Sequence, residues 1–474
     1  MTAKSISMWC AGALVVGGMF WLGGQPSWAA EKPAAAGQHA AIEAVPPGTP
    51  EAAATDEAAA TDPPPAPLSH EALASDGNDQ CVNFCGTPLC SPPGRYWMRA
   101  DYLMWWTNGS RLPPLVTTSP LNTPSAQAGV LGQPGTAILF GGNVVGGDVR
   151  SGFRTTVGMW LDCCHVWDLE FDYLSLDERS TNFSANSTVD PILARPFYDV
   201  NPNDFRTGVP GGQSSELVAY PGLVAGAVAV EAKNYFQSAG VLVSRNLCSC
   251  NSCGACDSCA DTCGGACGCD SLCVRGCRTD MLVGFRYYNL SDSLGITEDL
   301  LVTQPGPASG TRIRVLDNFR TRNDFYGSEI GLRTQIYRGR WSMEVLTKIA
   351  MGNTHETINI GGQTFVNGSL LPPPNGGVLA VDSNSGVYQR DELTVIPQLG
   401  LEVGYQINCR WRAYGGYDIL YWGAVATAAD QIDLNVDTRN VPPVTQTGLP
   451  SPAFTGKTDA FWAQGIHLGL ECRF

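Results

Sequence analysis

The chain has 474 residues, a formal net charge of −15 and only 15% charged residues. This acidity argues against a nucleic-acid binder, because such proteins need a basic surface to replace the counterions of phosphate. The 18 cysteines indicate an oxidising compartment rather than the cytosol. No stretch keeps an apolar heptad, so no coiled coil is expected.

Residues 1–29 have the features of a secretory signal peptide. Lys4 supplies the basic start, residues 6–22 are apolar, and Ser27-Trp28-Ala29 offers a small-x-small cleavage site. An uncleaved membrane anchor is the alternative interpretation. We expect the mature chain to begin near Ala30.

Residues 30–94 predict a disordered periplasmic tether. This segment is rich in Ala, Pro and acidic residues and poor in aromatic and β-branched ones, so it cannot bury enough surface to offset the cost of ordering. It carries Cys81, Cys85 and Cys90 near its end. No later apolar run reaches the ~18 residues of a spanning helix, so any membrane span must be a β-barrel.

From residue 95 onward the dominant period is two, which is typical of β-strands. The clearest case is Trp167, Leu169, Phe171 and Tyr173, which alternate with acidic residues. Each candidate strand can supply the ~9–11 residues of a tilted membrane strand, although a soluble β-sandwich shows the same alternation. The candidates lie near residues 99–106, 153–162, 167–173, 228–246, 279–290, 319–337, 341–352, 393–407, 411–423 and 459–474.

The connections between these strands favour the barrel, because they alternate between long and short. Long ones are expected at 108–149, 178–227, 291–318, 353–392 and 424–458, and short ones at 163–165, 338–340 and 408–410. Outer-membrane barrels have short periplasmic turns and long outer loops. Aromatic residues at strand ends, such as Trp160, Trp341 and Trp411, fit two interfacial girdles. We therefore predict an all-β, transmembrane, antiparallel up-and-down barrel of about 10 strands (about 8–12) over residues 95–474.

Phe474 ends the chain, and apolar residues precede it at steps of two. A last strand with an aromatic carboxy-terminus predicts recognition by the barrel-assembly machinery, with Phe474 as the signal. The expected location is the cell outer membrane, in contact with its lipid.

The side chains expected inside the barrel carry charges of both signs. An ~8-stranded barrel is filled by its own side chains, and open aqueous pores usually need ~16–18 strands. Opposite charges in a narrow lumen can pair into an ionic core, whereas a selective ion channel would favour one sign. The candidate lumen residues are Arg154, Asp168, Glu170, Lys233, Arg286, Glu329, Arg333, Glu344, Lys348, Glu402, Arg412 and Asp418.

A cysteine-rich insert is expected at 247–278, on the periplasmic side of the predicted topology. Disulfides, internal or to a neighbouring protein, compete with a metal site and with a free thiol tail. The spacing of Cys253, Cys256, Cys259 and Cys263 resembles a ferredoxin run, but so dense a cluster produces such spacings by chance, and we assign no metal or cofactor. The ten cysteines are Cys248, Cys250, Cys253, Cys256, Cys259, Cys263, Cys267, Cys269, Cys273 and Cys277.

No catalytic motif stands out. His355 beside Glu356 could act as a base, but a surface pair of this kind is more often simply solvated. His467 is expected to join a hydrogen-bond network in the lumen. A nucleophile elbow and a His-Glu-x-x-His motif are both missing from the sequence. We expect a protein that is not an enzyme.

Several strings resemble a known family. They include Met98–Trp106, Pro113–Pro120, Gly129–Thr136, Arg150–Gly152, Gly284–Tyr287 and Thr321–Gly327. Together they are similar to the seventh of the putative beta-barrel porin families, from bacteria with outer membranes, over about residues 95–474. The resemblance implies a fold and a location, and it carries no binding residues with it.

Two functions remain open. One is a channel for ions or small solutes, in which lumen residues set the selectivity. The other is a non-conducting structural or surface-interaction protein, linked by disulfides at its periplasmic rim as a homo- or hetero-oligomer.

Overall fold

The computed structural model describes residues 94–162, 165–201, 211–252, 275–373, 375–408, 410–442 and 448–474. All of them belong to one compact unit, Ala74–Phe474. The expected signal peptide, the tether with Cys81, Cys85 and Cys90, and cysteines 253–273 lie outside the described residues.

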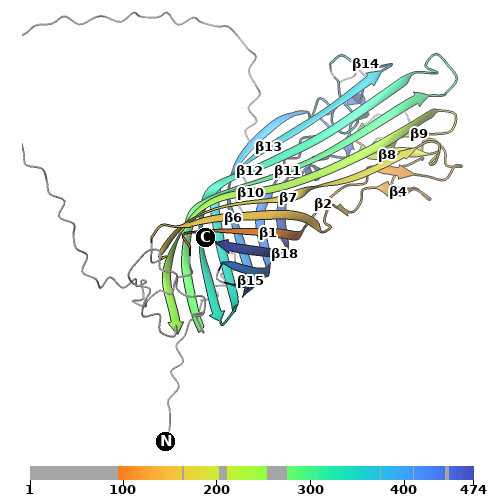
Figure 1. Cartoon of the computed structure of the whole chain (residues 1–474). Helices are drawn as coiled ribbons and strands as arrows, with labels where there is room; N and C mark the ends of the chain where they lie inside the picture. Colours follow the sequence, from red (N-terminus) through yellow and green to blue (C-terminus); the bar gives the residue numbers. More distant parts are fainter. Residues whose placement is uncertain are drawn as a thin grey trace, which may run out of the picture. The chain divides into compact units, whose positions relative to one another are not determined.

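Ten antiparallel strands form a closed ring, as the sequence predicted (Figure 1). Following the ring from β12, the order is β12-β11-β10-β7-β6-β1-β18-β16-β15-β13, and pairing of β13 with β12 closes it. The strands are β1 (Tyr96–Thr107), β6 (Arg150–Trp160), β7 (Trp167–Asn186), β10 (Val224–Ser252), β11 (Arg275–Val302), β12 (Arg312–Arg338), β13 (Trp341–Val366), β15 (Gly386–Gln406), β16 (Trp411–Val425) and β18 (Asp459–Arg473).

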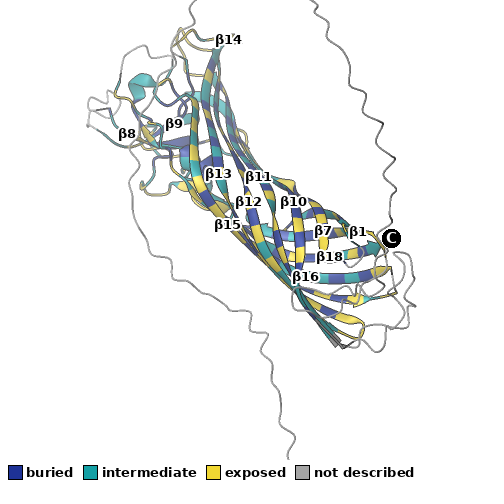
Figure 2. Cartoon of the chain, turned by 90° about the vertical axis from the view of Figure 1, so that its left-hand side faces the viewer, coloured by how far each residue is buried: buried dark blue, intermediate teal, exposed yellow. Residues whose placement is uncertain are grey.

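An apolar belt surrounds the ring at the end where the short turns lie. On β13 the outward side chains from Trp341 to Met351 are apolar apart from Thr347, while Glu344 and Lys348 are buried on the inward face. Figure 2 shows the resulting alternation of buried and exposed positions along the strands. This span matches the ~9–11 residues of a tilted membrane strand. Beyond it the outward positions turn polar, and His355 is the second of them. Among the described residues, no helix is long and apolar enough to cross a membrane.

One side of the ring continues far beyond the belt. Strands β10, β11, β12 and β13 have 29, 28, 27 and 26 residues, whereas β1 and β6 have 12 and 11. The connections expected at 291–318 and 353–392 are therefore shorter than predicted, because strands occupy both ends of each. Apolar and polar residues still alternate along this part of the wall, but here apolar residues such as Leu294 and Ile296 point inward and polar residues point outward.

An outer domain made from the long connections packs against the inner face of this extended wall. It contains β2 (Ser110–Arg111), β3 (Val116–Thr118), β4 (Ala137–Phe140), β5 (Val144–Val145), β8 (Leu193–Asp199), β9 (Gly212–Ala219), η1 (Ala429–Gln431), β17 (Asn435–Val436) and η2 (Thr438–Asn440). The short β14 (Ser369–Leu370) belongs to the wall instead, where it pairs with β13. Its apolar core joins Leu193 and Phe197 of β8 to Ile296 of β11 and Phe319 of β12. The extended strands thus replace lipid contact by a buried protein core.

The strands also run into the expected cysteine-rich insert at both of its ends. β10 continues to Ser252 and β11 begins at Arg275, with Cys250 opposite Cys277 in the register. The described part of the predicted insert 247–278 is therefore a continuation of the barrel wall.

Candidate functional site

A network of buried charges, here called the ionic layer, fills the barrel inside the apolar belt. Its centre is Arg286 of β11, which donates to Asp172 of β7 at 2.5 and 2.8 Å. The same guanidinium donates to Glu329 of β12 at 2.7 Å, and the Lys348 ammonium lies 3.5 Å from Glu329. Period-two alternation places these side chains inward, since their neighbours in sequence face the belt.

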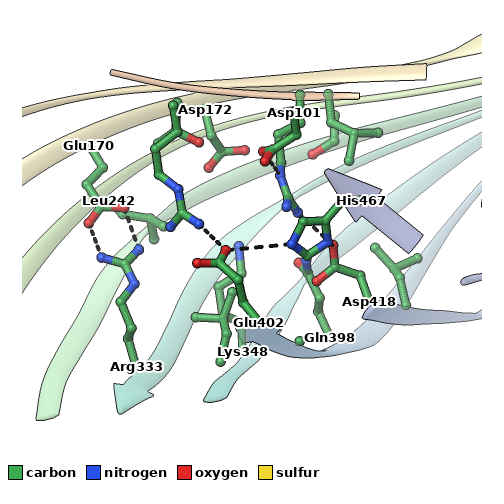
Figure 3. A pocket seen from close by; sticks show the side chains of 18 of the residues that line it. Asp101, Glu170, Asp172, Leu242, Arg333, Lys348, Gln398, Glu402, Asp418 and His467 are labelled. Carbon is green, nitrogen blue, oxygen red and sulfur yellow. Dashed lines mark hydrogen bonds and ion pairs between the residues drawn. The ribbon is translucent and has the colours of Figure 1, made fainter. Parts of the chain in front are cut away.

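A second group in the ionic layer links β1, β6, β16 and β18. Arg154 donates to Asp101 at 2.8 Å and to Asp418 at 2.9 Å. The Nδ1 atom of His467 lies 2.9 Å from Asp418, and its Nε2 atom lies 3.6 Å from Glu402. His467 is therefore part of the lumen network (Figure 3).

The remaining pairs lie nearer the short turns. Arg333 forms two bonds to Glu170, at 2.5 and 2.7 Å. Arg412 donates to Glu402 at 2.7 Å and to Glu471 at 3.1 Å, and Arg99 also pairs with Glu402. The paired charges leave a cavity of about 70 Å³ between them, which is large enough to hold water among the charged groups.

The structure brings most of the predicted lumen residues together. Four of their lumen partners were missing from the candidate set: Arg99, Asp101, Asp172 and Glu471. Asp172 has the same parity on β7 as Glu170, and Glu471 the same parity on β18 as His467. Arg99 and Asp101 lie on the face of β1 opposite to Tyr102, so counting alternate residues along each strand would have found all four. The candidates found in or beside the ionic layer are Arg154, Asp168, Glu170, Arg286, Glu329, Arg333, Glu344, Lys348, Glu402, Arg412 and Asp418.

Lys233 does not belong to this set, and its prediction is corrected. Its side chain is 38% exposed and pairs with Glu231 at 2.8 Å, on the opposite face of β10 from the buried Phe236. It lies beyond the apolar belt, where the outside of the sheet meets water and the inside is apolar. Polar side chains of a membrane barrel are expected to point into the lumen, and this expectation does not hold beyond the apolar belt.

An aromatic layer lies directly beyond the ionic layer. Nine of the ten ring strands supply at least one of its buried side chains, and β6 supplies the buried Gly152 at this level. The members are Leu103, Trp105, Leu174, Leu176, Phe236, Tyr288, Leu290, Phe325, Ala350, Ile396, Leu420, Trp422, Val425, Phe461 and Ala463.

The rings of this layer meet across the lumen. Phe236 of β10 lies 5.1 Å from Phe461 of β18, and Tyr288 of β11 lies 6.0 Å from Trp422 of β16, between ring centroids. Phe325 of β12 lies 6.2 Å from Trp422. Phe236, Phe325 and Trp422 have no exposed surface at all. These contacts join strands that are three or four positions apart around the ring, so their side chains reach across the lumen.

The segment after β16 closes the mouth of the barrel further out. Asn323 of β12 donates to the Ala426 carbonyl at 2.9 Å and accepts from the Ala426 amide at 2.8 Å. The Ala428 amide donates to Asp292 of β11 at 2.9 Å. Ala426, Ala428 and Ala429 are buried in the core of the outer domain. Three successive layers, ionic, aromatic and apolar, therefore fill the interior.

A buried ion triad fixes the outer domain to the wall. Arg195 of β8 lies 2.5 Å from Glu298 of β11 and 2.7 Å from Asp317 of β12. Burial alone would lower the pKa of Arg195, but the charges of Asp317 and Glu298 outweigh it and raise that pKa. All three groups are almost fully buried, so each depends on the others for its solvation.

His355 and Glu356 do not form the pair considered from the sequence. They point to opposite faces of β13, and the His355 Nδ1 atom lies 3.0 Å from Asp391 on the exposed face. Glu356 is buried and pairs with Arg390 at 2.5 Å. Among the described residues, no cluster of His, Cys, Asp and Glu could hold a metal ion.

Several solved outer-membrane proteins are similar to this chain at low identity and low TM-score. The outer membrane protease OmpT from Escherichia coli is 9% identical, with a TM-score of 0.36, over 81% of this chain and 99% of its own. The Pseudomonas putida toluene transporter TodX is 10% identical, with a TM-score of 0.15, over 81% and 91%. An anion-selective porin from Comamonas acidovorans is 9% identical, with a TM-score of 0.14, over 81% and 100%.

No curated protein matches the chain in sequence. The family comparison does give a match, to putative beta barrel porin-7, over residues 97–474. This match covers the whole ring and the outer domain, and it agrees with the resemblance in the sequence. The chain therefore belongs to the putative beta barrel porin-7 family, and it is an outer-membrane β-barrel protein.

Proposed function

We propose that this outer-membrane barrel is closed to solutes and acts as an anchor that displays its outer domain at the cell surface. The observation that carries the proposal is the aromatic layer, whose rings meet across the lumen and are almost fully buried. With the outer domain at the cell surface, the short turns face the periplasm, as in other outer-membrane barrels.

The interior supports a permanent closure rather than a loose constriction. Each buried aromatic side chain removes ~150–250 Å² from water, and an open path would have to separate several of them. The ionic layer beneath is cross-linked by paired charges, and breaking one buried pair costs about 3–5 kcal/mol. A pore along the axis would require both layers to rearrange.

A channel for ions or small solutes is the second candidate. The cavity of about 70 Å³, lined by charged residues of both signs, favours it. This cavity lies below the aromatic layer, so conduction would need Phe236, Phe461 and Trp422 to move apart.

Bulk permeability of reconstituted vesicles distinguishes these two functions. The folded full chain is inserted into liposomes, and their swelling in small sugars and in salts is compared with that of empty liposomes. The anchor proposal predicts equal rates. Swelling that rises with the amount of folded protein would overturn it and support the channel.

The proposal includes no catalysis. The exposed His355–Asp391 pair is held on the flat outer face of β13 and β15, and the buried lumen charges are engaged with one another. Catalysis would require a substrate to reach one of these groups and an activated nucleophile to lie beside it.

We also propose covalent attachment at the short-turn rim. Cys248 and Cys277 lie near the ends of β10 and β11, and Cys472 near the end of β18 is a free thiol. Seven of the ten cysteines of the sequence cluster, from Cys253 to Cys273, lie outside the described residues and remain part of this prediction. Covalent multimers in isolated outer membranes that disappear with a reductant would support attachment, and their absence under non-reducing conditions would contradict it.

Two further parts of the proposal concern biogenesis. Residues 1–29 would direct secretion, and Phe474 would be read by the barrel-assembly machinery. Phe474 pairs with Tyr96 through two backbone hydrogen bonds of 2.9 and 2.8 Å, which joins the two ends of the barrel domain. Truncation of Phe474 should reduce the folded barrel in cells, measured by heat-dependent gel mobility.

A further inference from the structure

Exposed arginines and outward aromatic residues alternate along the short-turn rim. Arg95 precedes Tyr96, Arg340 precedes Trp341 and Arg410 precedes Trp411. The three arginines are exposed, and the three aromatic side chains are between 44% and 59% exposed. The same pattern recurs at the carboxy-terminus with Arg473 and Phe474.

Backbone hydrogen bonds show that these pairs lie side by side. The Arg340 carbonyl accepts from the Gln406 amide at 2.8 Å, at the start of the turn that contains Arg410. The Arg410 carbonyl accepts from the Arg473 amide at 2.9 Å. Phe474 in turn pairs with Tyr96, next to Arg95. The backbones of four pairs are therefore contiguous along the rim, and the set is here called the arginine arc: Arg340-Trp341, Arg410-Trp411, Arg473-Phe474 and Arg95-Tyr96. The Arg473 side chain is the exception within the arc, because it is partly buried and points to Glu471 of the ionic layer.

The aromatic residues of the arc also contact one another or their neighbours. Trp341 packs against Tyr405 with 5.0 Å between ring centroids, and Tyr96 stacks on Phe474 at 6.2 Å. They sit at the edge of the apolar belt, where aromatic rings prefer the boundary between hydrocarbon and water. The arginines follow one residue, or ~3.3 Å, further from the hydrocarbon.

The charge of the arc is largely uncompensated. Within the described part of the chain, Arg95, Arg340 and Arg410 take part in no ion pair, and only Arg473 pairs, with Glu471 at 2.6 Å. At the opposite edge of the belt, Arg322 pairs with Asp324 at 2.7 Å. A concentration of free positive charge is unexpected in a chain with a net charge of −15.

We propose that the arginine arc binds the phosphate headgroup of an anionic phospholipid in the leaflet at the short-turn rim. Guanidinium groups donate two parallel hydrogen bonds to phosphate, and three of them are exposed here without acidic partners. The aromatic rings would lie beside the glycerol region, and the belt beneath them would hold the acyl chains. An acidic soluble partner would account for the arginines but would leave the aromatic half of every pair without a role.

Brominated lipids test this proposal. The full chain is refolded in vesicles of brominated phosphatidylglycerol or brominated phosphatidylcholine mixed with the unbrominated lipid, and quenching of tryptophan fluorescence gives the relative binding constant. We expect a several-fold preference for phosphatidylglycerol, with on the order of fivefold per arginine as an upper limit. The preference should decrease with salt, because these charges are exposed.

Two triple variants remove equal charge from opposite ends of the protein. R95Q/R340Q/R410Q should reduce the relative constant to about one, whereas the matched control R312Q/R314Q/R320Q, at exposed arginines of β12 beyond the belt, should keep the preference. Heat-dependent gel mobility confirms that all three proteins have folded barrels.

Four outcomes would overturn the proposal. One is equal quenching by both lipids in the unchanged protein, and another is a preference that survives in R95Q/R340Q/R410Q. The third is loss of the preference for phosphatidylglycerol when inorganic phosphate is added at constant ionic strength. This result would mean that the arc binds a free anion. A preference that emerged only at high salt would indicate that the acidic amino-terminal segment occupies the arc, and it would also count against lipid as the occupant.

Discussion

Phe236 of β10 and Phe461 of β18 meet inside the barrel with their ring centroids 5.1 Å apart, although three strands separate them along the shorter side of the ring. A contact of this kind requires a lumen narrow enough for side chains from distant strands to meet inside it. It therefore connects the narrow ten-stranded ring with the closed state that we propose.

The ionic layer should stabilise the barrel through Arg286. Replacing it by Met leaves Asp172 and Glu329 buried without their main partner, so R286M should lose about 3–5 kcal/mol of unfolding free energy. Urea unfolding in lipid vesicles, followed by tryptophan fluorescence, measures this loss. The exposed R320M is the control and should change stability by less than ~0.5 kcal/mol. Equal midpoints for R286M and R320M would show that the layer contributes nothing specific.

The position of the membrane is tested on β15, whose outward face is apolar from Leu393 to Tyr405. Arginine at the lipid midplane costs ~2–4 kcal/mol, and near an interface ~0–1 kcal/mol. Leu401→Arg, inside the belt, should therefore destabilise the folded barrel far more than Leu393→Arg at its outer edge. Reversible unfolding from vesicles compares the two, and a larger loss for L393R would mean that the belt is misplaced.

Arg195 should hold the outer domain on the wall. R195A leaves Glu298 and Asp317 buried and unpaired, so β8 and β9 should become strongly labile to hydrogen exchange. The barrel below should keep its heat-dependent gel mobility, because the ionic and aromatic layers are untouched. Tyr198→Ala, at an exposed position of the same strand, serves as the control. Unchanged exchange in β8 of R195A would refute the anchoring role.

One outer loop should respond to acid through Asp437. Burial alone would raise the pKa of this carboxyl, but hydrogen bonds from Arg439 and from the Leu449 amide outweigh it and lower that pKa. A lowered carboxyl pKa stabilises the fold above the ordinary value of about 4, and this stabilisation is lost as the pH falls through the folded pKa.

The order of residues 437–442 and 448–451 should therefore be greatest at neutral pH and fall below about pH 4. Hydrogen exchange, corrected for the intrinsic effect of pH, measures it. Asp437→Asn should show high exchange already at neutral pH and little further change in acid. A pH response in D437N as large as in the unchanged protein would show that another group is responsible.

The ring itself could be predicted from sequence, because period-two alternation and short turns are local signals. The lumen pairs Arg154–Asp101 and Arg286–Asp172 could be predicted only as inward-facing charges, since their partners come from distant strands. Beyond the belt the same alternation misled. Lys233 was assigned to the lumen but faces water, because the outside of the wall no longer contacts lipid there. Leu294 and Ile296 were assigned to a connection, but they lie on the extended β11 and face a protein core. The aromatic layer was missed for a related reason. Phe236 and Phe325 have the inward parity, but inward aromatics were not counted as lumen residues.

Single-channel recording in a planar bilayer tests the closed lumen most directly, with folding confirmed beforehand by gel mobility. The full chain should give no conductance steps, and neither should the control Phe153→Ala on the exposed face of β6. F236A/W422A, which removes two rings of the aromatic layer, should show small or intermittent steps. Reproducible conductance steps from the unchanged protein would contradict the account, because they would require an open path through the aromatic layer.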